Sequence, residues 1–237
     1  VKTAANGGND GNSGTTENSA LATIQAAVDR IKDDYDTNGY APVIKIYDGQ
    51  HRGWQDWGAS LGRHKKGGGP IIYLGNLANP EAVRIFHDAG VAVISLDGYA
   101  QAVIVGMRID GNQATSVYAT TGSVIELGLV TVTGPIPILA EADGKIYGTS
   151  TLKFLGSMVY GMQANKGALV EVVPNVIIQF EDSTFSQHFI FGFNHGTVIV
   201  PYHFHDAVYD SEGWVIGGTH DPVGGVTFQG SFVGRKA

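Results

Sequence analysis

The sequence predicts an all-β fold, a β-solenoid whose open N-terminal end is covered by an α-helix. Glycine supplies 34 of the 237 residues without a collagen-like three-residue period, so turns must be frequent. Beyond residue 90 the apolar segments are short, and no alternation of strand and helix continues. A weak internal repeat in the second half of the chain is typical of stacked coils.

Composition excludes several classes of protein. The chain has no cysteine, which excludes disulfide frameworks, thiolate metal sites and cysteine nucleophiles. Its net charge is −7 with only 15 Lys and Arg, so it lacks the positive field that nucleic acids and anionic membranes require. No apolar run approaches the roughly 20 residues of a membrane-spanning helix. We therefore expect neither a nucleic-acid partner nor membrane insertion.

The N-terminal region divides into two predicted elements. Residues 1–19 are rich in Gly, Asn, Ser and Thr, which predicts a flexible linker or arm. Residues 20–36 predict a cap helix that begins after Ser19, because their apolar residues recur at helical spacing. A strand is expected at 43–47, and the turn residues Asp48-Gly49 are expected to end it.

The remaining elements are predicted as strands with one exception. Asn79 could cap a short helix over residues 80–87, since proline suits the first helical position. The strands are expected at residues 71–73, 91–96, 103–109, 124–127, 129–133, 152–155, 169–173, 176–180, 197–200 and 226–228.

The repeat supports stacking of these strands. An aromatic residue or leucine precedes a glycine, and an alternating apolar strand follows, at Gly122, Gly144, Gly167 and Gly196. The first two intervals between these glycines are nearly equal, and the third is longer. A single coil of this size cannot bury its own apolar face, so stacking is expected. An antiparallel sandwich or jelly roll also has short strands and glycine-rich turns, and it stays as the alternative.

The order of these elements resembles a known family. A Thr-Ile-Gln-Ala-Ala-Val helix at 23–28, a strand ending at Tyr47-Asp48-Gly49 and the glycine-punctuated coils are similar to the right-handed parallel β-helix of the pectate-lyase superfamily. The similarity is greatest to its viral branch, the tailspikes and receptor-binding fibres of bacteriophages. It covers about residues 20 to 210. It implies one β-helix domain over 20–237, with 211–237 as a C-terminal cap or intersubunit segment.

The resemblance also implies a function. Such a protein lies on the surface of a virion or phage-like particle and binds cell-surface polysaccharide for host attachment. It is usually a homotrimer, joined to other particle proteins through its N-terminal segment. No diagnostic catalytic motif accompanies the resemblance, so two alternatives stay open. One is a polysaccharide-degrading hydrolase or lyase, and the other is a purely structural fibre or capsid decoration protein.

Two carboxylates are the candidate catalytic residues. Glu126 and Glu171 each lie four residues after a repeat glycine, with Gly148 in the matching place between them. Strand alternation points both outward. Two coils would separate them by roughly 9.6 Å, near the upper limit for the acid and base of an inverting glycosidase. Solvated surface acids are the alternative interpretation.

Two histidines form a candidate metal site. His203 and His205 would share one face of a strand, and their imidazoles could bind a divalent metal if a third ligand joined them. The His-x-His pattern resembles an iron-binding motif at the tip of some phage spikes. No other cofactor is expected, and surface or packing histidines are the alternative.

The segment 47–57 is the candidate glycan-binding loop. It contains Trp54, Trp57, Arg52 and His51. A sugar ring stacks on an aromatic face while its hydroxyls bond to polar groups, so this composition suits a glycan. The alternative is that one tryptophan packs beneath the cap helix.

Overall fold

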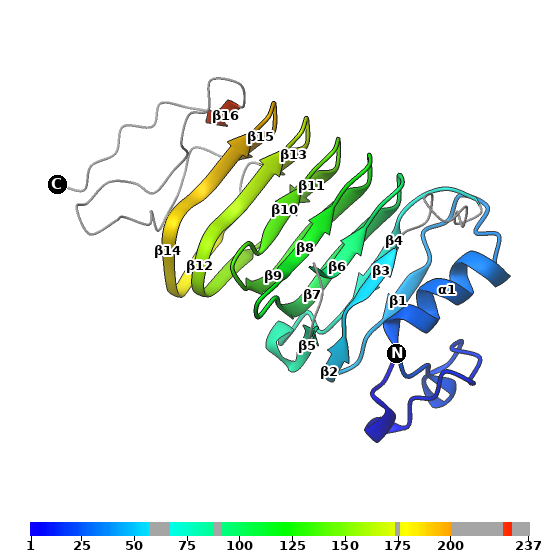
Figure 1. The fold of residues 1–237 in the computed structure, drawn as a ribbon. Coiled ribbons are helices and arrows are strands. Elements are labelled where there is room, and N and C mark those ends of the chain that lie inside the picture. Colours follow the sequence, from blue (N-terminus) through cyan, green and yellow to red (C-terminus); the bar gives the residue numbers. More distant parts are fainter. Residues whose placement is uncertain (57–66, 88–91, 174–175, 201–224, 229–237) are drawn as a thin grey trace.

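The computed structural model describes residues 1–56, 67–87, 92–173, 176–200 and 225–228. These residues form a parallel β-solenoid with one α-helix at its N-terminal end (Figure 1). The predicted fold class is confirmed. In the described part of the chain, no helix has the length and apolar character needed to cross a membrane.

The solenoid has three faces, which we name A, B and C. Face A consists of β1 (Val43–Lys45), β4 (Ile71–Leu74), the first halves of β7 (Gln101–Asp110) and β9 (Val124–Thr133), β11 (Lys145–Gly148), β13 (Leu169–Val172), β15 (Thr197–Val200) and β16 (Gly225–Phe228). Face B consists of β2 (Gly49–Arg52), β5 (Val83–Phe86), the second halves of β7 and β9, and the first parts of β12 (Leu152–Asn165) and β14 (Ile178–Phe193).

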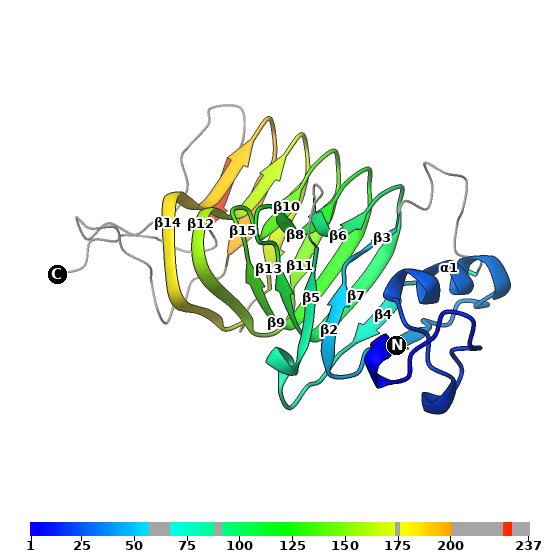
Figure 2. The same cartoon turned by 60° about the horizontal axis from the view of Figure 1, so that its bottom comes forward.

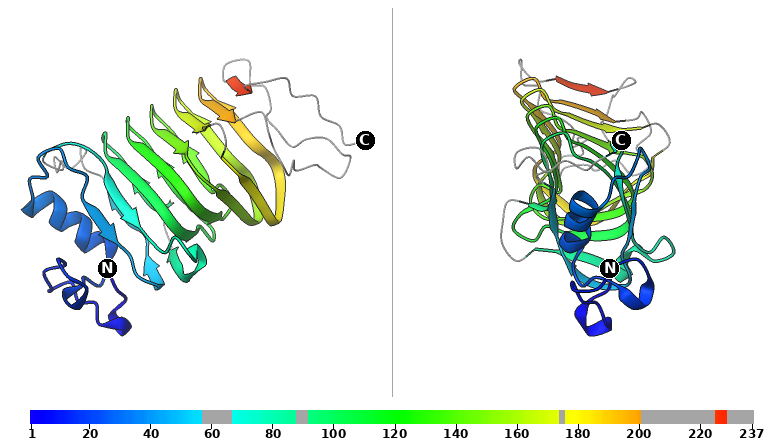
Figure 3. Two further views of the ribbon diagram at one scale, coloured as in Figure 1. Left: turned by 180° about the vertical axis from the view of Figure 1, so that it is seen from behind. Right: turned by 90° about the vertical axis from the view of Figure 1, so that its right-hand side faces the viewer.

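Face C consists of β3 (Trp54–Asp56), β6 (Ala92–Leu96), β8 (Thr115–Ala119), β10 (Ile138–Ala140) and the ends of β12 and β14. Every pairing recorded between these strands is parallel, and the long strands bend from one face to the next. The end-on view in Figure 3 shows the coils lying over one another.

Aliphatic ladders fill the interior. Ile125, Ile146, Val170 and Val198 are paired strand by strand on face A, and each is almost completely buried. Since alternate residues of a strand point to opposite sides, the residues between them face outward. The outer side chains of each face are therefore lined up coil by coil.

Two-residue turns connect face C to face A. Both residues of each turn have positive φ, and the pairs are Gly98-Tyr99, Thr121-Gly122, Ala142-Asp143, Lys166-Gly167 and Asn194-His195. Backbone hydrogen bonds link successive turns, for example from Gly122 to the carbonyl of Ala142 at 3.3 Å. The inter-coil bonding therefore continues through this corner.

The N-terminal segment differs from the prediction of a flexible arm. Residues 1–19 are folded and contain two 3₁₀ helices, η1 (Ala4–Asn6) and η2 (Glu17–Ser19). The carboxylate of Asp10 accepts hydrogen bonds of 2.8 Å from the backbone N–H groups of both Ala22 and Thr23. Hydrogen bonds from polar side chains to the backbone hold this segment in place. The prediction rested on its low content of apolar residues, which does not reveal such bonds.

The helix α1 (Ile24–Asp34) lies across the first coil beside this segment (Figure 2). Its cap is Thr23, whose hydroxyl accepts a hydrogen bond of 3.1 Å from the N–H of Ala26. The helix therefore begins later than predicted, and Ser19 belongs to η2 instead.

The predicted helix over 80–87 was wrong. Only Pro80–Ala82 form a 3₁₀ turn, η3, and β5 follows directly. Val83 and Ile85 are β-branched and completely buried, so they join the face B ladder. Of the predicted C-terminal segment 211–237, the structure describes only β16, which pairs with β15.

Candidate functional site

A groove of about 430 Å³ lies on the outer side of face B. Residues from β2, β5, β7, β9 and β12 and from the loops beside them line it. They are Gln50, Arg84, Phe86, His87, Arg108, Asp110, Asn112, Thr133, Leu155 and Gly156. We call it the face B groove.

Strand register aligns the polar side chains of this face. Gln50, Arg84, Arg108, Thr131 and Lys153 occupy one outward column, each paired with the next. Neighbouring strands are about 4.8 Å apart, so the column presents donors at that interval along the solenoid axis. Such a ladder matches an extended polymer better than a compact ligand.

A buried carboxylate holds the two arginines in place. Asp110 accepts hydrogen bonds from the Nε atoms of Arg84 and Arg108, the latter at 2.8 Å. The hydroxyl of Thr133 also donates to it, at 3.3 Å. Only 7% of the Asp110 side chain is exposed, whereas 46% of the Arg84 side chain is. Charge-assisted hydrogen bonds from the buried Asp110 carboxylate thus fix the orientation of both guanidinium groups.

A second carboxylate borders the column. Glu81 of η3 lies 3.2 Å from the Arg108 guanidinium, and the hydroxyl of Thr131 donates to it at 2.6 Å. Lys153 lies 3.9 Å from Glu81 and also pairs with Glu181. Burial acts to lower the pKa of Arg108, but Asp110 and Glu81 outweigh it and raise that pKa. The Arg108 guanidinium therefore stays charged.

The groove combines these donors with apolar surface. Phe86 and Leu155 are half-buried in its lining, beside the amide side chains of Gln50 and Asn112. Hydroxyl groups and carboxylates of a ligand can bond to the guanidinium and amide groups, while a sugar ring can lie on the apolar side chains. The arrangement is chemically suited to binding a carbohydrate.

The predicted glycan-binding residues separate in the structure. Arg52 lies on the outer side of face B, next to Phe86 of the groove. Trp54 is 1% exposed and stacks on Tyr73 with ring centroids 4.3 Å apart, so the prediction that it contacts a glycan was wrong. It belongs to the core, and Trp57 lies outside the described residues.

His51 also lies inside the solenoid. It is 3% exposed, and its Nε2 lies 2.8 Å from the carbonyl oxygen of Tyr47. Burial lowers its pKa, although the bond to Tyr47 opposes that shift in part. A buried imidazole cannot reach a surface polysaccharide, so this glycan-binding prediction was wrong as well.

The two predicted catalytic carboxylates share one outward column of face A. Tyr147 is paired with Glu126 on one side and with Glu171 on the other. The residue between them is thus Tyr147 and not Gly148. A half-buried tyrosine therefore separates the two carboxylates in the column, at the place where a glycine was predicted. Both glutamates lie away from the face B groove.

The predicted metal ligands His203 and His205 lie outside the described residues. Among the residues described, no group of three or more His, Asp or Glu side chains could hold a metal ion. The metal site stays a prediction.

Sequence reasoning missed the residues that form the groove. Arg108-Ile109-Asp110 already shows two charged residues flanking an apolar one, which indicates an outward pair on a strand. Arg84 follows the same alternation earlier in the chain. Arg84 and Arg108 are brought together by the register between β5 and β7. The prediction of a helix over residues 80–87 hid this pairing, because it left no strand at Arg84.

Comparison with known proteins supplies no relative. No protein-family model, no curated protein and no solved structure matches the chain.

Proposed function

We propose that this chain is the polysaccharide-binding part of a virion surface spike or fibre and that the face B groove is its glycan site. One observation carries the proposal. Two guanidinium groups, fixed by the buried Asp110, lie beside the apolar side chains of Phe86 and Leu155. Donors next to a flat apolar surface are what carbohydrate recognition requires.

Preorganisation supports binding at this groove. The Nε atom of Arg108 is held by Asp110, so binding a ligand costs little further side-chain entropy. Arg84 is the more exposed of the two, and its terminal nitrogens are the natural contact for a glycan. The parallel ladder extends the donor column to Lys153, which suits a polymer.

A glycan-binding assay tests this proposal. The full chain is screened against bacterial surface polysaccharides, and Arg84→Gln is compared with Lys166→Gln, an exposed change at a turn between faces C and A. We expect Arg84→Gln to weaken binding about tenfold, equivalent to about 1.4 kcal/mol, and the control to bind as the parent does. Absence of binding, or equal loss in both variants, would contradict the proposal.

The same samples test the enzymatic alternative. Fragments released from the polysaccharide, and lost in Glu126→Gln or Glu171→Gln, would show degradation. Polysaccharide recovered intact together with retained binding would support attachment alone.

The proposed trimer has its own support. The outer side of face A carries half-buried apolar side chains, among them Ile72, Val103, Tyr147, Leu169 and Ile199. Glu126 and Glu171 share the outward column with Tyr147 and Ile199, so contact with a second copy of the chain would combine apolar packing with polar pairing. Light scattering should give three times the mass of one chain, and a monomer at micromolar concentration would exclude this assembly.

A further inference from the structure

The guanidinium group of Arg84 carries donors that the protein itself does not use. Its Nε donates to Asp110, which is the one hydrogen bond that this side chain makes within the part of the chain that the structure describes. The side chain is 46% exposed. The terminal nitrogens Nη1 and Nη2, with two N–H groups each, therefore remain available to a ligand.

Arg108 has a different role in the same groove. Its Nε donates to Asp110 at 2.8 Å, and its Nη1 donates to Glu81 at 3.2 Å. Only 27% of its side chain is exposed. Two carboxylates thus share this guanidinium group, and Arg84 is the better placed of the two arginines to receive an anion.

The charges of the groove leave a local surplus at Arg84. Asp110 places one negative charge between two guanidinium groups, so these three groups together carry one positive charge. Farther along the column Lys153 contacts both Glu81 and Glu181, and these three together carry one negative charge. An anionic group of a ligand is therefore favoured at the Arg84 end of the groove and disfavoured at the Lys153 end.

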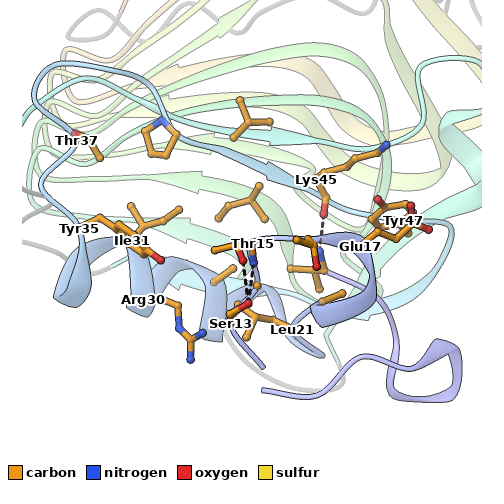
Figure 4. Close-up of a pocket in the computed structure, with 18 of the residues that line it drawn as sticks. Ser13, Thr15, Glu17, Leu21, Arg30, Ile31, Tyr35, Thr37, Lys45 and Tyr47 are labelled. Atoms are coloured by element: carbon orange, nitrogen blue, oxygen red, sulfur yellow. Dashed lines mark hydrogen bonds between the residues drawn. The ribbon is translucent and has the colours of Figure 1, made fainter. Parts of the chain in front are cut away.

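The cavity at the N-terminal end of the solenoid offers no comparable group among the described residues that line it. This cavity has a volume of about 530 Å³ and lies between residues 13–21, α1 and β1 (Figure 4). Its guanidinium group belongs to Arg30, which donates from Nη1 to the carbonyl of Asn12 and has its Nε 3.7 Å from Asp34. The unused guanidinium nitrogens of Arg84 thus distinguish the face B groove from this cavity.

Phe86 lies on the same outer side of β5, two residues after Arg84. Two residues of a strand span about 6.6 Å, so the ring and the guanidinium group are neighbours on the sheet surface. A sugar ring that stacks on Phe86 can therefore direct an acidic substituent toward Arg84. A carboxylate fits best, because its two oxygens can lie in one plane with the two Nη donors.

We propose that the face B groove selects polysaccharides that bear carboxylate groups and that the terminal nitrogens of Arg84 bind the carboxylate. The inference rests on the proposed glycan-binding function and specifies the class of polysaccharide. Charge-assisted hydrogen bonds are roughly twice as strong as those between neutral groups, so a neutral counterpart of the polymer binds less well. The chain as a whole carries a net charge of −7, so only local contacts can select an acidic polymer.

Chemical reduction of the carboxylates tests this class without any change to the protein. Acidic bacterial surface polysaccharides are compared with their carboxyl-reduced forms, in which each carboxylate has become a neutral hydroxymethyl group. Biolayer interferometry measures binding of the full chain to both forms and to neutral polysaccharides. We expect reduction to weaken binding about tenfold. Neutral polysaccharides should bind no better than the reduced forms.

The outcomes separate this inference from the proposed function. Equal affinity for native and reduced polymers would overturn the carboxylate preference but leave polysaccharide binding in place. Stronger binding of a neutral polysaccharide than of every acidic one would do the same. A chain that binds no polysaccharide at all would contradict the proposed function itself.

A variant assigns the preference to Arg84. Arg84→Gln should weaken binding of the native polymer about tenfold and leave binding of the reduced polymer within about twofold. Lys166→Gln, at a turn away from the groove, should change neither affinity. Equal losses for both polymers in Arg84→Gln would show that Arg84 contacts neutral hydroxyl groups, which would refute its role as the carboxylate site.

Arg84→Lys separates geometry from charge. Lysine keeps the positive charge but lacks the planar pair of terminal nitrogens. We expect Arg84→Lys to bind the native polymer more tightly than Arg84→Gln and more weakly than the parent. Binding by Arg84→Lys as tight as that of the parent would refute two-point recognition of the carboxylate.

Discussion

The Nε atom of Arg108 donates to the carboxylate of Asp110 at 2.8 Å, although that carboxylate is almost completely buried on an outer face of the solenoid. Arg84 donates to the same group from the neighbouring strand. Removing the negative charge would leave two guanidinium groups side by side. The buried aspartate is thus the feature on which the groove's geometry depends.

Asp110→Asn should lower the free energy of unfolding by about 1–3 kcal/mol, since the charged partner of both arginines is lost. Urea unfolding measures the change. Glu181→Gln serves as the control, because Glu181 pairs with Lys153 while 55% of its side chain is exposed. It should cost less than about 1 kcal/mol. Equal effects of the two substitutions would contradict the special role of Asp110.

Trp54 should matter for folding and not for glycan binding. Trp54→Ala should cost roughly 3–5 kcal/mol because a fully buried ring is lost. Trp54→Phe preserves much of the packing against Tyr73 and should give a folded protein with unchanged glycan affinity. A folded Trp54→Phe protein that binds glycan less well would show that this tryptophan reaches the ligand.

The buried His51 predicts a pH dependence of stability. Burial lowers its pKa in the folded state, so the unfolded chain binds the proton more readily. Stability should fall as the pH drops below 6.5, the ordinary pKa of histidine, until the folded-state pKa is passed. His51→Gln should flatten this part of the pH profile. A pH profile of His51→Gln as steep as that of the parent would contradict this account.

The turns between faces C and A predict a steric effect. A Cβ atom on Gly144 would lie 2.3 Å from the carbonyl oxygen of Ala119. Gly144→Ala should therefore cost about 1–3 kcal/mol through overpacking. Gly128→Ala is the matched control, since its nearest neighbour would be at an ordinary 3.4 Å. Thermal unfolding of both variants would reveal the difference, and similar midpoints would contradict it.

The glycine repeat predicted the solenoid but not its register. Gly122 and Gly167 are the second residues of positive-φ turns, whereas Gly144 and Gly196 follow such turns. Within the turn, glycine is favoured because the backbone has positive φ. Just after the turn, glycine is favoured because the backbone of the previous coil approaches too closely for a Cβ atom. Pairing on face A makes Val124, Lys145, Leu169 and Thr197 structurally equivalent, and the coils between these four residues lengthen in chain order.

The candidate site was harder to predict than the fold. Alternation assigned the outward direction of Glu126 and Glu171 correctly, because the ladder on either side is purely aliphatic. Trp54 was misassigned because its glycine neighbours suggest a loop, while the structure buries its ring against Tyr73. The groove joins residues from separate coils, and no local pattern shows which coils are neighbours.

The position of a bound polysaccharide tests the central claim most directly. Hydroxyl-radical footprinting of the chain with and without the polysaccharide it binds would locate the contact. We predict protection centred on Arg84, Phe86 and Arg108 of face B. Protection centred on Glu126 and Glu171 of face A, with face B unchanged, would contradict the account.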